Sequence, residues 1–264
     1  MSGRVITLLT DFGMKDPYVA EMKGVILNIY PQANIIDITH QVEKYNVIQG
    51  AFILASAAKY FPKGTIHVVV IDPGVGTKRK AIIIESKRYF FVGPDNGVLT
   101  MAARMDGIRR IIEISAENYL GDKFSLTFHG RDIFAPVAAY LAKGVKIEEL
   151  GEEIDRIVEV KLPEPQIKGE RIFGIIIYVD SFGNIITNIS KEHLQRIGVE
   201  RRLKATMRGE KSLELKICRA YGEVEKGEFL AIIDSFNLLE ISMNQGNAAE
   251  KLKVKSGEKI EITI

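Results

Sequence analysis

Acidic side chains stand directly after several apolar runs of this sequence, and that position suits them for chemistry. Asp11 follows the strand-like run from Arg4 to Thr10, and Asp72 follows a β-branched run from Thr65 to Ile71. Asp95 comes in the same way after a third run. One such Asp alone is usually a turn-former or a helix cap. Because the pattern recurs, we interpret these carboxylates as candidates for binding a substrate or accepting a proton.

The segment from Asp72 to Arg79 is the densest of these candidates. It reads Asp-Pro-Gly-Val-Gly-Thr-Lys-Arg, so two glycines let the backbone approach a ligand while Asp and Arg supply opposite charges. A phosphate-binding loop is the obvious alternative. The segment lacks both the Gly-Lys-Ser/Thr ending of a nucleotide-triphosphate loop and the three-glycine spacing of a dinucleotide site, and we therefore favour neither phosphate interpretation.

Three further segments combine residue types that suit a polar organic ligand. His129 lies in Phe-His-Gly-Arg-Asp before a predicted helix, where a histidine is more often structural than catalytic. Asp180, Phe182 and Asn184 follow a predicted strand and could pair with an amine, stack on a base and bond the edge of adenine. Phe-Gly-Asn is also good turn chemistry. The stretch from Asp234 to Glu240 is equally ambiguous.

The elements that must position these residues alternate between strand and helix in the first half of the chain. The predicted elements are strands at 4–10, 34–38, 65–71, 81–84, 89–92 and 111–114 and helices at 17–30, 47–60 and 132–143. The opening order β-α-β-α-β is typical of a mostly parallel sheet flanked by helices. In such sheets ligands bind beyond the carboxyl ends of the strands, which is where Asp11 and Asp72 fall.

The chain is predicted to contain two domains. A length of 264 residues suits two domains of ordinary size. The stretch from Lys161 to Glu170 combines two prolines, a glycine and charges, as linkers do. We therefore expect an α/β domain at residues 1–165. Short strand-like runs follow at 172–179, 203–207, 213–218, 229–233 and 259–264, separated by polar turns. They predict a smaller, mainly β domain at residues 170–264.

Five motifs occur in order along nearly the whole chain. They are Thr-Asp-Phe-Gly from Thr10, Val-Ile-Asp-Pro-Gly-Val-Gly-Thr from Val70 with Arg79, Gly-Pro-Asp-Asn-Gly from Gly93, Phe-His-Gly-Arg-Asp from Phe128, and Asp180 with Phe-Gly-Asn from Phe182. Together they resemble the family of S-adenosyl-L-methionine (SAM) hydrolases, or SAM hydroxide adenosyltransferases, which is related to the SAM-dependent fluorinase and chlorinase. Relatives that transfer halide carry Tyr at the position of Asp72, so the resemblance is to the hydrolase branch.

The resemblance implies an activity and a set of site residues. Asp72, Arg79 and His129 would hold and activate the water that attacks the 5′ carbon of SAM, releasing adenosine and L-methionine. Asp11 would bind the ribose hydroxyls. The contacts implied in the second domain are Asp180 with the methionine amino group, Asn184 with adenine, and Phe182, Ser235, Glu240 and the backbone near Met243 with adenosine. The resemblance also implies a homotrimer whose active sites lie between neighbouring subunits.

These residue types suit the implied reaction. SAM is a sulfonium ion, so displacement at C5′ releases a neutral thioether that needs neither protonation nor a Lewis acid. We therefore expect a metal-independent enzyme without a cofactor, with SAM as the substrate. Hydroxide and a sulfonium lose their opposite charges in the transition state, so a water-poor site should accelerate the attack. Either Asp72 or His129 could accept the proton, with Arg79 orienting the carboxylate, and the sequence does not decide between them.

Two other functions compete with this interpretation. A metal-dependent nucleoside or phosphoester hydrolase could use as ligands Asp11, His40, Asp72, Asp95 and His129. The sequence contains no tight ligand pair such as His-x-x-x-His, which argues against that class. A non-catalytic adenosine or SAM sensor would bind the same molecule without turnover. Assays of metal dependence and of turnover separate the three functions.

The composition narrows the partners and the compartment. With 46% hydrophobic and 27% charged residues and a net charge of +2, the chain can form a core and has no strong basic excess. We therefore predict neither nucleic acid nor a membrane as a partner. Cys218 is the only cysteine, which excludes an intrachain disulfide. No apolar run approaches the ~18 residues of a membrane span and no secretory signal is visible, so we expect a cytoplasmic protein.

Overall fold

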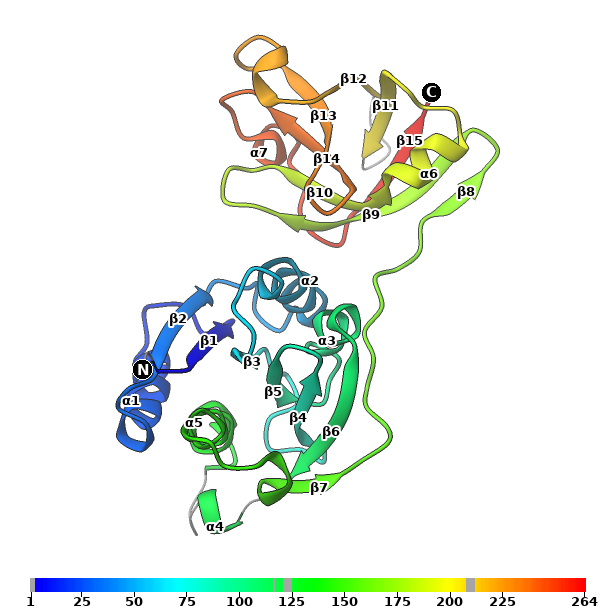
Figure 1. Cartoon of the computed structure of the whole chain (residues 1–264). Helices are drawn as coiled ribbons and strands as arrows, with labels where there is room; N and C mark the ends of the chain where they lie inside the picture. Colours follow the sequence, from blue (N-terminus) through cyan, green and yellow to red (C-terminus); the bar gives the residue numbers. More distant parts are fainter. Residues whose placement is uncertain (1–2, 116, 121–124, 208–211) are drawn as a thin grey trace. The chain divides into compact units, whose positions relative to one another are not determined.

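The structure is a computed structural model that describes residues 3–115, 117–120, 125–207 and 212–264. The chain divides into two compact units, Met1–Lys161 and Leu162–Ile264. Each unit is built around its own sheet, with seven strands in the first and eight in the second among the described residues. Figure 1 shows the two sheets and the elements that flank them.

The first unit is an α/β structure. Its described strands are β1 (Val5–Thr10), β2 (Asn34–Thr39), β3 (Ile66–Val70), β4 (Ala81–Ser86), β5 (Phe90–Pro94), β6 (Ile108–Ile114) and β7 (Gly151–Glu153). Its described helices are α1 (Tyr18–Ile29), α2 (Val47–Ala58), α3 (Thr100–Asp106), α4 (Glu117–Leu120), the π-helix η1 (Gly130–Phe134), α5 (Ala135–Lys143) and the 3-10 helix η2 (Ile147–Glu149). This arrangement confirms the predicted α/β class.

The strands that precede the candidate carboxylates form the parallel part of this sheet. The strand order is β2-β1-β3-β5-β4-β6-β7. Strands β2, β1, β3 and β5 run parallel to one another, and β4, β6 and β7 add antiparallel pairs at the other edge. Because β1, β3 and β5 point the same way, Asp11, Asp72 and Asp95 all follow the same edge of the sheet.

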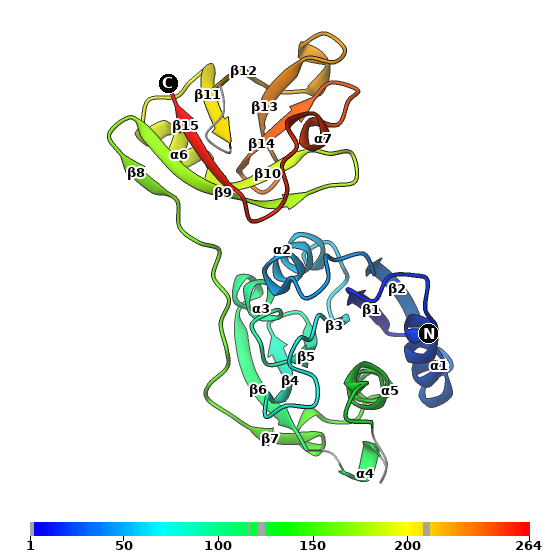
Figure 2. The same cartoon turned by 180° about the vertical axis from the view of Figure 1, so that it is seen from behind.

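Helices cover both faces of this sheet, and the alternation of side chains along the strands explains why. Ile6, Leu8 and Val68 pack in one apolar cluster with α1 and α5. Leu9 and Val69, which point the other way, pack in a second cluster with α2 and α3. Figure 2 shows the two helix pairs on opposite sides of the strands. Strands buried on both faces are continuously apolar, which is the pattern seen in the sequence.

His67, the second residue of β3, is a fully buried histidine that serves the fold. Its Nδ1 lies 2.7 Å from Thr7 Oγ1, and its ring stacks on Phe91 with 5.2 Å between centroids. Burial lowers the pKa of His67 to about 3, so the ring is neutral in the folded protein. An unfolded chain protonates this histidine below about pH 6.5.

We therefore expect the free energy of unfolding to fall as the pH drops from about 6.5 towards 3, with His67 contributing up to ~1.4 kcal/mol per pH unit. His67→Gln keeps a polar partner for Thr7 but does not titrate. Urea denaturation of both proteins at several pH values should show a smaller slope of stability against pH in the variant. Equal slopes would contradict the assignment.

The second unit is mainly β, as predicted. Its described strands are β8 (Gln166–Lys168), β9 (Arg171–Val179), β10 (Ile185–Ser190), β11 (Arg202–Met207), β12 (Leu213–Cys218), β13 (Phe229–Ile233), β14 (Leu238–Met243) and β15 (Lys259–Thr263). The described helices are α6 (Lys191–Arg196), the 3-10 helix η3 (Tyr221–Glu223) and α7 (Ala248–Leu252). The strand order is β10-β14-β13-β12-β11-β15-β9-β8, and β9 also pairs with β10.

The stretch 161–170 that we interpreted as a linker contains a short strand. Strand β8 pairs antiparallel with β9, and Ile167 lies opposite Ile172. The hairpin between them turns at Gly169, whose φ of +59° lies in the left-handed region. Gly169 suggested a flexible linker in the sequence, but in the structure it forms part of a tight turn.

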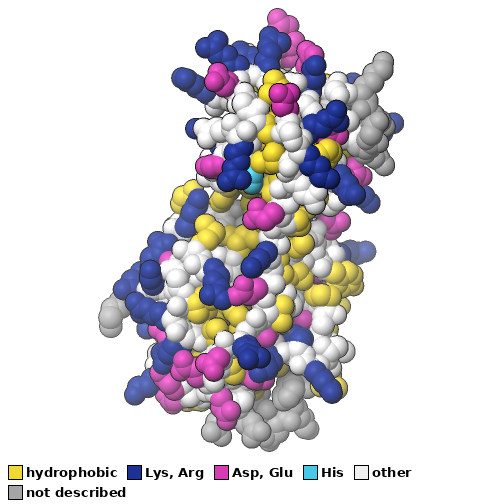
Figure 3. Space-filling model, turned by 90° about the vertical axis from the view of Figure 1, so that its right-hand side faces the viewer, with side chains coloured by type: hydrophobic (Ala, Val, Ile, Leu, Met, Phe, Trp, Pro, Cys, Tyr) yellow, Lys and Arg dark blue, Asp and Glu magenta, His cyan; other side chains and the backbone are white. Residues whose placement is uncertain are grey.

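None of the helices in the described ranges combines the length and the apolar composition needed to cross a membrane. On the face in Figure 3, Lys and Arg side chains are interspersed with Asp and Glu on both units.

Candidate active site

The carboxyl ends of β1 and β3 border a cavity of about 200 Å³ in the first unit. Its lining includes Asp11 after β1, Asp72 after β3 and His129 directly before η1. These residues are far apart in the sequence, and the parallel sheet brings them together. Arg79 does not line the cavity itself but is hydrogen-bonded to Asp72, which does.

A chain of contacts joins Asp72, Arg79 and His129. Arg79 Nε donates to Oδ1 and Oδ2 of Asp72 at 2.9 and 3.0 Å, and Arg79 Nη2 donates to Oδ2 as well. The same Nη2 lies 2.7 Å from Nδ1 of His129. The Asp72 and Arg79 side chains are only 4% and 9% exposed. A forked, largely buried pair of this kind holds both groups in one orientation.

The contact with Arg79 determines the tautomer of His129. A guanidinium group has donors only, so His129 Nδ1 must accept the hydrogen bond, and the proton of the neutral ring lies on Nε2. Burial, and next to it the charge of Arg79, lowers the pKa of His129. The ring is therefore neutral at neutral pH and presents Nε2–H as a donor, while the Nδ1 lone pair is already occupied.

The two loops that carry these residues touch through their backbones. Gly76, in the loop after Asp72, has φ +75°, and a Cβ there would lie 2.6 Å from the carbonyl oxygen of Leu126. Leu126 lies in the segment that leads to His129. Only glycine fits this approach, so the second glycine of the Asp-Pro-Gly-Val-Gly motif brings the two loops together.

Asp11 contacts two cavity residues that the sequence reasoning missed. The Tyr45 backbone N–H donates to Asp11 Oδ2 at 2.9 Å, and Lys44 Nζ donates to the Asp11 carbonyl oxygen. Tyr45 adopts φ +66° and exposes 70% of its surface. Neither feature is visible in the sequence, where both residues belong to an ordinary polar loop before α2.

The other residues of the metal-ligand alternative have different partners. Asp95 Oδ1 accepts from the Val158 N–H at 2.8 Å. His40 contacts Thr10 Oγ1 through Nδ1 at 2.9 Å and Asp37 through Nε2 at 3.1 Å. Within the described ranges, no three His, Cys, Asp or Glu side chains are grouped so that they could hold a metal ion. The five ligands of that alternative are not assembled.

In the second unit, Asp180, Phe182 and Asn184 form the turn between β9 and β10. Asp180 Oδ1 accepts from the backbone N–H groups of Phe182 and Asn184, both at 2.9 Å, and Asn184 Nδ2 donates to Asp180 Oδ2 at 2.9 Å. The residues are thus turn-formers, and the turn also displays them. Phe182 is 76% exposed, whereas Asn184 is buried with its Oδ1 left for a further donor.

Glu240 belongs to the same part of the second unit. It lies on β14 opposite Ile186 of β10, the strand that begins after Asn184. Its carboxyl group is buried, and Oε1 accepts from Ser242 Oγ at 2.6 Å and from the Tyr221 hydroxyl at 2.9 Å. Burial and then the charges of Asp180 and Asp234 raise the pKa of Glu240, whereas its two hydrogen bonds lower it.

The two remaining predicted contacts flank this cluster. Ser235 lies in the turn between β13 and β14, and Met243 ends β14, where it pairs with Phe229 of β13. Their placement near Glu240 follows from the β13–β14 hairpin. The structure gives neither side chain a hydrogen bond to Asp180, Asn184 or Glu240 in the described residues.

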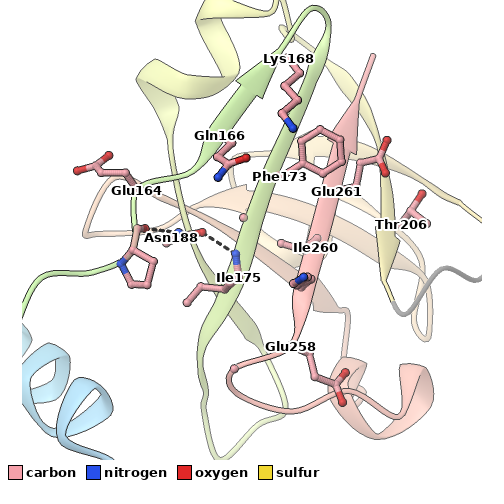
Figure 4. A pocket seen from close by; sticks show the side chains of 14 residues that line it. Glu164, Gln166, Lys168, Phe173, Ile175, Asn188, Thr206, Glu258, Ile260 and Glu261 are labelled. Atoms are coloured by element: carbon pink, nitrogen blue, oxygen red, sulfur yellow. Dashed lines mark hydrogen bonds between the residues drawn. The ribbon is translucent and has the colours of Figure 1, made fainter.

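A wider groove of about 900 Å³ lies elsewhere in the second unit, along β8, β9 and β15. Figure 4 shows its lining, which includes Lys168, Phe173 and Glu261 and none of the predicted site residues. Asn188, at its floor, donates to the Pro163 carbonyl and accepts from the Ile175 N–H. The side-chain amide of Asn188 is thus bonded to the protein's own backbone. The size of the groove alone does not make it the active site.

Fold and site together define the class of this protein as a two-domain α/β enzyme with an Asp-Arg-His set beyond the carboxyl ends of its parallel strands. Residues 6–151 match the SAM hydroxide adenosyltransferase N-terminal domain, and residues 174–261 match the C-terminal domain of the same family. The chain belongs to the SAM hydroxide adenosyltransferase family.

Individual relatives agree with this assignment over nearly their whole length. An (R)-S-adenosyl-L-methionine hydrolase of Methanocaldococcus jannaschii is 42% identical, covering 98% of this chain and 95% of that protein. A protein of the same name from Salinispora tropica is 37% identical, covering 98% and 97%. The crystal structure of an uncharacterized conserved protein from Thermotoga maritima is similar with a TM-score of 0.91 at 41% identity, covering 98% and 100%.

Proposed function

We propose that this enzyme hydrolyses SAM to adenosine and L-methionine by attack of water or hydroxide at C5′, with Asp72, Arg79 and His129 directing the nucleophile. The observation that carries the proposal is the unbroken contact from the Asp72 carboxylate through Arg79 to the His129 ring. The relatives named (R)-S-adenosyl-L-methionine hydrolase support the substrate.

Within this set, Asp72 is the proposed proton acceptor. His129 Nδ1 is occupied by Arg79, so the imidazole has no lone pair ready for the proton of water. Asp72 Oδ1 accepts one hydrogen bond from Arg79 and keeps a second acceptor position. His129 then acts as a donor through Nε2–H and helps to hold hydroxide in line with the C5′–S bond.

The substrate contacts are proposed to come from both units, and the complete site to form between subunits of a homotrimer. A cavity of about 200 Å³ is smaller than the roughly 300–1,000 Å³ usual for organic ligands. Asp11 would bind the ribose hydroxyls. The rest of the substrate would be held by the second unit of a neighbouring subunit, through Asp180, Phe182, Asn184, Ser235, Glu240 and Met243. The exposed ring of Phe182 is consistent with a surface that a ligand covers.

The enzyme is further proposed to need no metal or cofactor and to act in the cytoplasm without nucleic acid or membrane partners. The neutral leaving group supports the first point. The single cysteine and the small net charge of +2 support the second.

Incubation of the purified protein with SAM should give adenosine and L-methionine in equal amounts, and turnover should survive exhaustive chelation, because a thioether leaves without Lewis-acid help. Liquid chromatography of the products tests both points. Adenine or homocysteine among the products would contradict the proposed reaction. Activity lost on chelation and restored by one divalent ion would favour the metal-dependent hydrolase, and binding without turnover would favour a sensor.

A further inference from the structure

Tyr221 is connected to the proposed substrate-binding residues through Glu240. It lies in η3, between β12 and β13, and its hydroxyl donates to Glu240 Oε1 at 2.9 Å. The Tyr221 side chain is partly open to solvent, whereas Glu240 is only 6% exposed. A half-exposed aromatic residue thus places its polar end against a buried carboxyl group.

Burial and the neighbouring carboxylates keep this hydroxyl protonated, so it acts as a donor. Burial, the hydrogen bond to Glu240 and then the charges of Glu240, Asp180 and Asp234 raise the pKa of Tyr221 to about 12. Tyr221 is therefore protonated at neutral pH and donates. Its hydrogen bond favours the ionised form of Glu240 against the burial and the neighbouring carboxylates that disfavour it.

Both donors to Glu240 act on the same oxygen. Ser242 Oγ and the Tyr221 hydroxyl bond to Oε1, at 2.6 and 2.9 Å, and together they set the rotation of the carboxyl group. The second oxygen, Oε2, accepts neither of these two hydrogen bonds. It is the atom that remains for a ligand.

We propose that Tyr221 is a positioning residue for substrate binding: its hydroxyl fixes the Glu240 carboxylate, which together with Asp180 attracts the positively charged part of SAM. This role of Glu240 goes beyond the adenosine contact that the resemblance implies. The inference rests on the proposed function, because it takes Glu240 and Asp180 as substrate contacts. SAM carries a sulfonium and an ammonium charge and the product adenosine carries neither, so an ionised pair favours SAM over adenosine.

Tyr221→Phe should raise KM for SAM about fivefold with little change in kcat, because it removes one hydrogen bond to the carboxylate and leaves the ring in place. The loss of that hydrogen bond raises the pKa of Glu240. KM of the wild type should rise as the pH falls through the pKa of Glu240, and in Tyr221→Phe this rise should begin at a higher pH. Glu240→Gln should lack this pH-dependent rise.

Tyr119→Phe is the matched control, because the Tyr119 hydroxyl donates to Glu149 Oε2 at the same 2.9 Å, in the first unit. It should leave KM and its pH dependence as in the wild type. Two outcomes would overturn the positioning role while the wild type still hydrolyses SAM. In the first, Tyr221→Phe leaves KM unchanged; in the second, KM rises but its pH profile does not shift. Either outcome leaves the proposed function intact.

The dissociation constant of SAM, measured by calorimetry over the same pH range, tests the inference without turnover. A weaker and pH-shifted affinity in Tyr221→Phe supports the positioning role even if no product forms, in which case the proposed hydrolysis alone fails. Identical affinities in the wild type and Tyr221→Phe overturn it.

Discussion

Asp72→Asn should lower kcat for SAM hydrolysis by ~10² to 10⁴-fold with a much smaller change in KM, because a positioned acid–base group typically contributes that much to the rate. Asn keeps the shape of the side chain and one acceptor for Arg79, but it cannot take the proton of water. Steady-state kinetics with chromatographic detection of adenosine measure both constants.

Asp95→Asn is the matched control for this substitution. Asp95 also follows a strand of the same sheet and is buried, but it bonds to the Val158 backbone and does not line the cavity. It should leave kcat close to the wild-type value. An effect below tenfold at both Asp72 and His129 would count against the proposed activation of water.

Arg79→Lys separates charge from geometry in the same site. Lysine keeps the positive charge but loses the planar fork that bonds Asp72 and His129 at once. We therefore expect Arg79→Lys to have a lower kcat than the wild type. If substitutions at Asp72, Arg79 and His129 instead changed only KM, the polar set would be a binding surface and the activating role would be wrong.

The elements around this site were predictable because they are buried in a simple way. The run from Arg4 to Thr10 predicted a strand, and β1 spans Val5–Thr10. The segment 17–30 predicted a helix, and α1 spans Tyr18–Ile29 with Val19, Met22 and Ile26 buried. Strands covered on both faces are short, continuous apolar runs, and helices covered on one face repeat their apolar residues every three or four positions, so one sequence suffices to find them.

Strand β10 was missed because two of its buried side chains, Thr187 and Asn188, are polar. Thr187 Oγ1 donates to the Leu239 carbonyl, and Asn188 bonds to the backbone of Ile175 and Pro163. These tertiary hydrogen bonds let polar residues occupy core positions, which hides the alternation expected of a strand. The partner strand β14 was missed as well, and Ser242 and Glu240 interrupt its apolar pattern in the same way.

The candidate site shows a similar limit. Asp72 and Arg79 are seven residues apart, so a loop can join them and the sequence can suggest the pair. His129 reaches Arg79 only through the packing of η1 and the close approach at Gly76. The resemblance to a family supplied what local patterns could not, whereas Tyr221 belongs to no motif and becomes visible only through its contact with Glu240.

Co-expression of Asp72→Ala and Asn184→Ala chains should restore activity that neither variant shows alone when assayed at SAM concentrations below the wild-type KM. If each site takes Asp72 from one subunit and Asn184 from its neighbour, every mixed trimer contains one interface with both residues intact. Random mixing of equal amounts then gives about a quarter of the wild-type sites, because about three quarters of the trimers are mixed and each regains about one site in three.

The control mixture combines Asp72→Ala with Arg79→Ala. These residues belong to one unit and are joined by direct hydrogen bonds, so no arrangement of such chains rebuilds an intact pair from two subunits. Activity should return in the first mixture and stay absent in the second. Restoration in neither would show that each site lies within one subunit, and restoration in both would trace the recovery to general stabilisation rather than to a shared site. Light scattering that shows an active monomer would rule out the trimer independently, because a monomer has no subunit interface at which to complete the site.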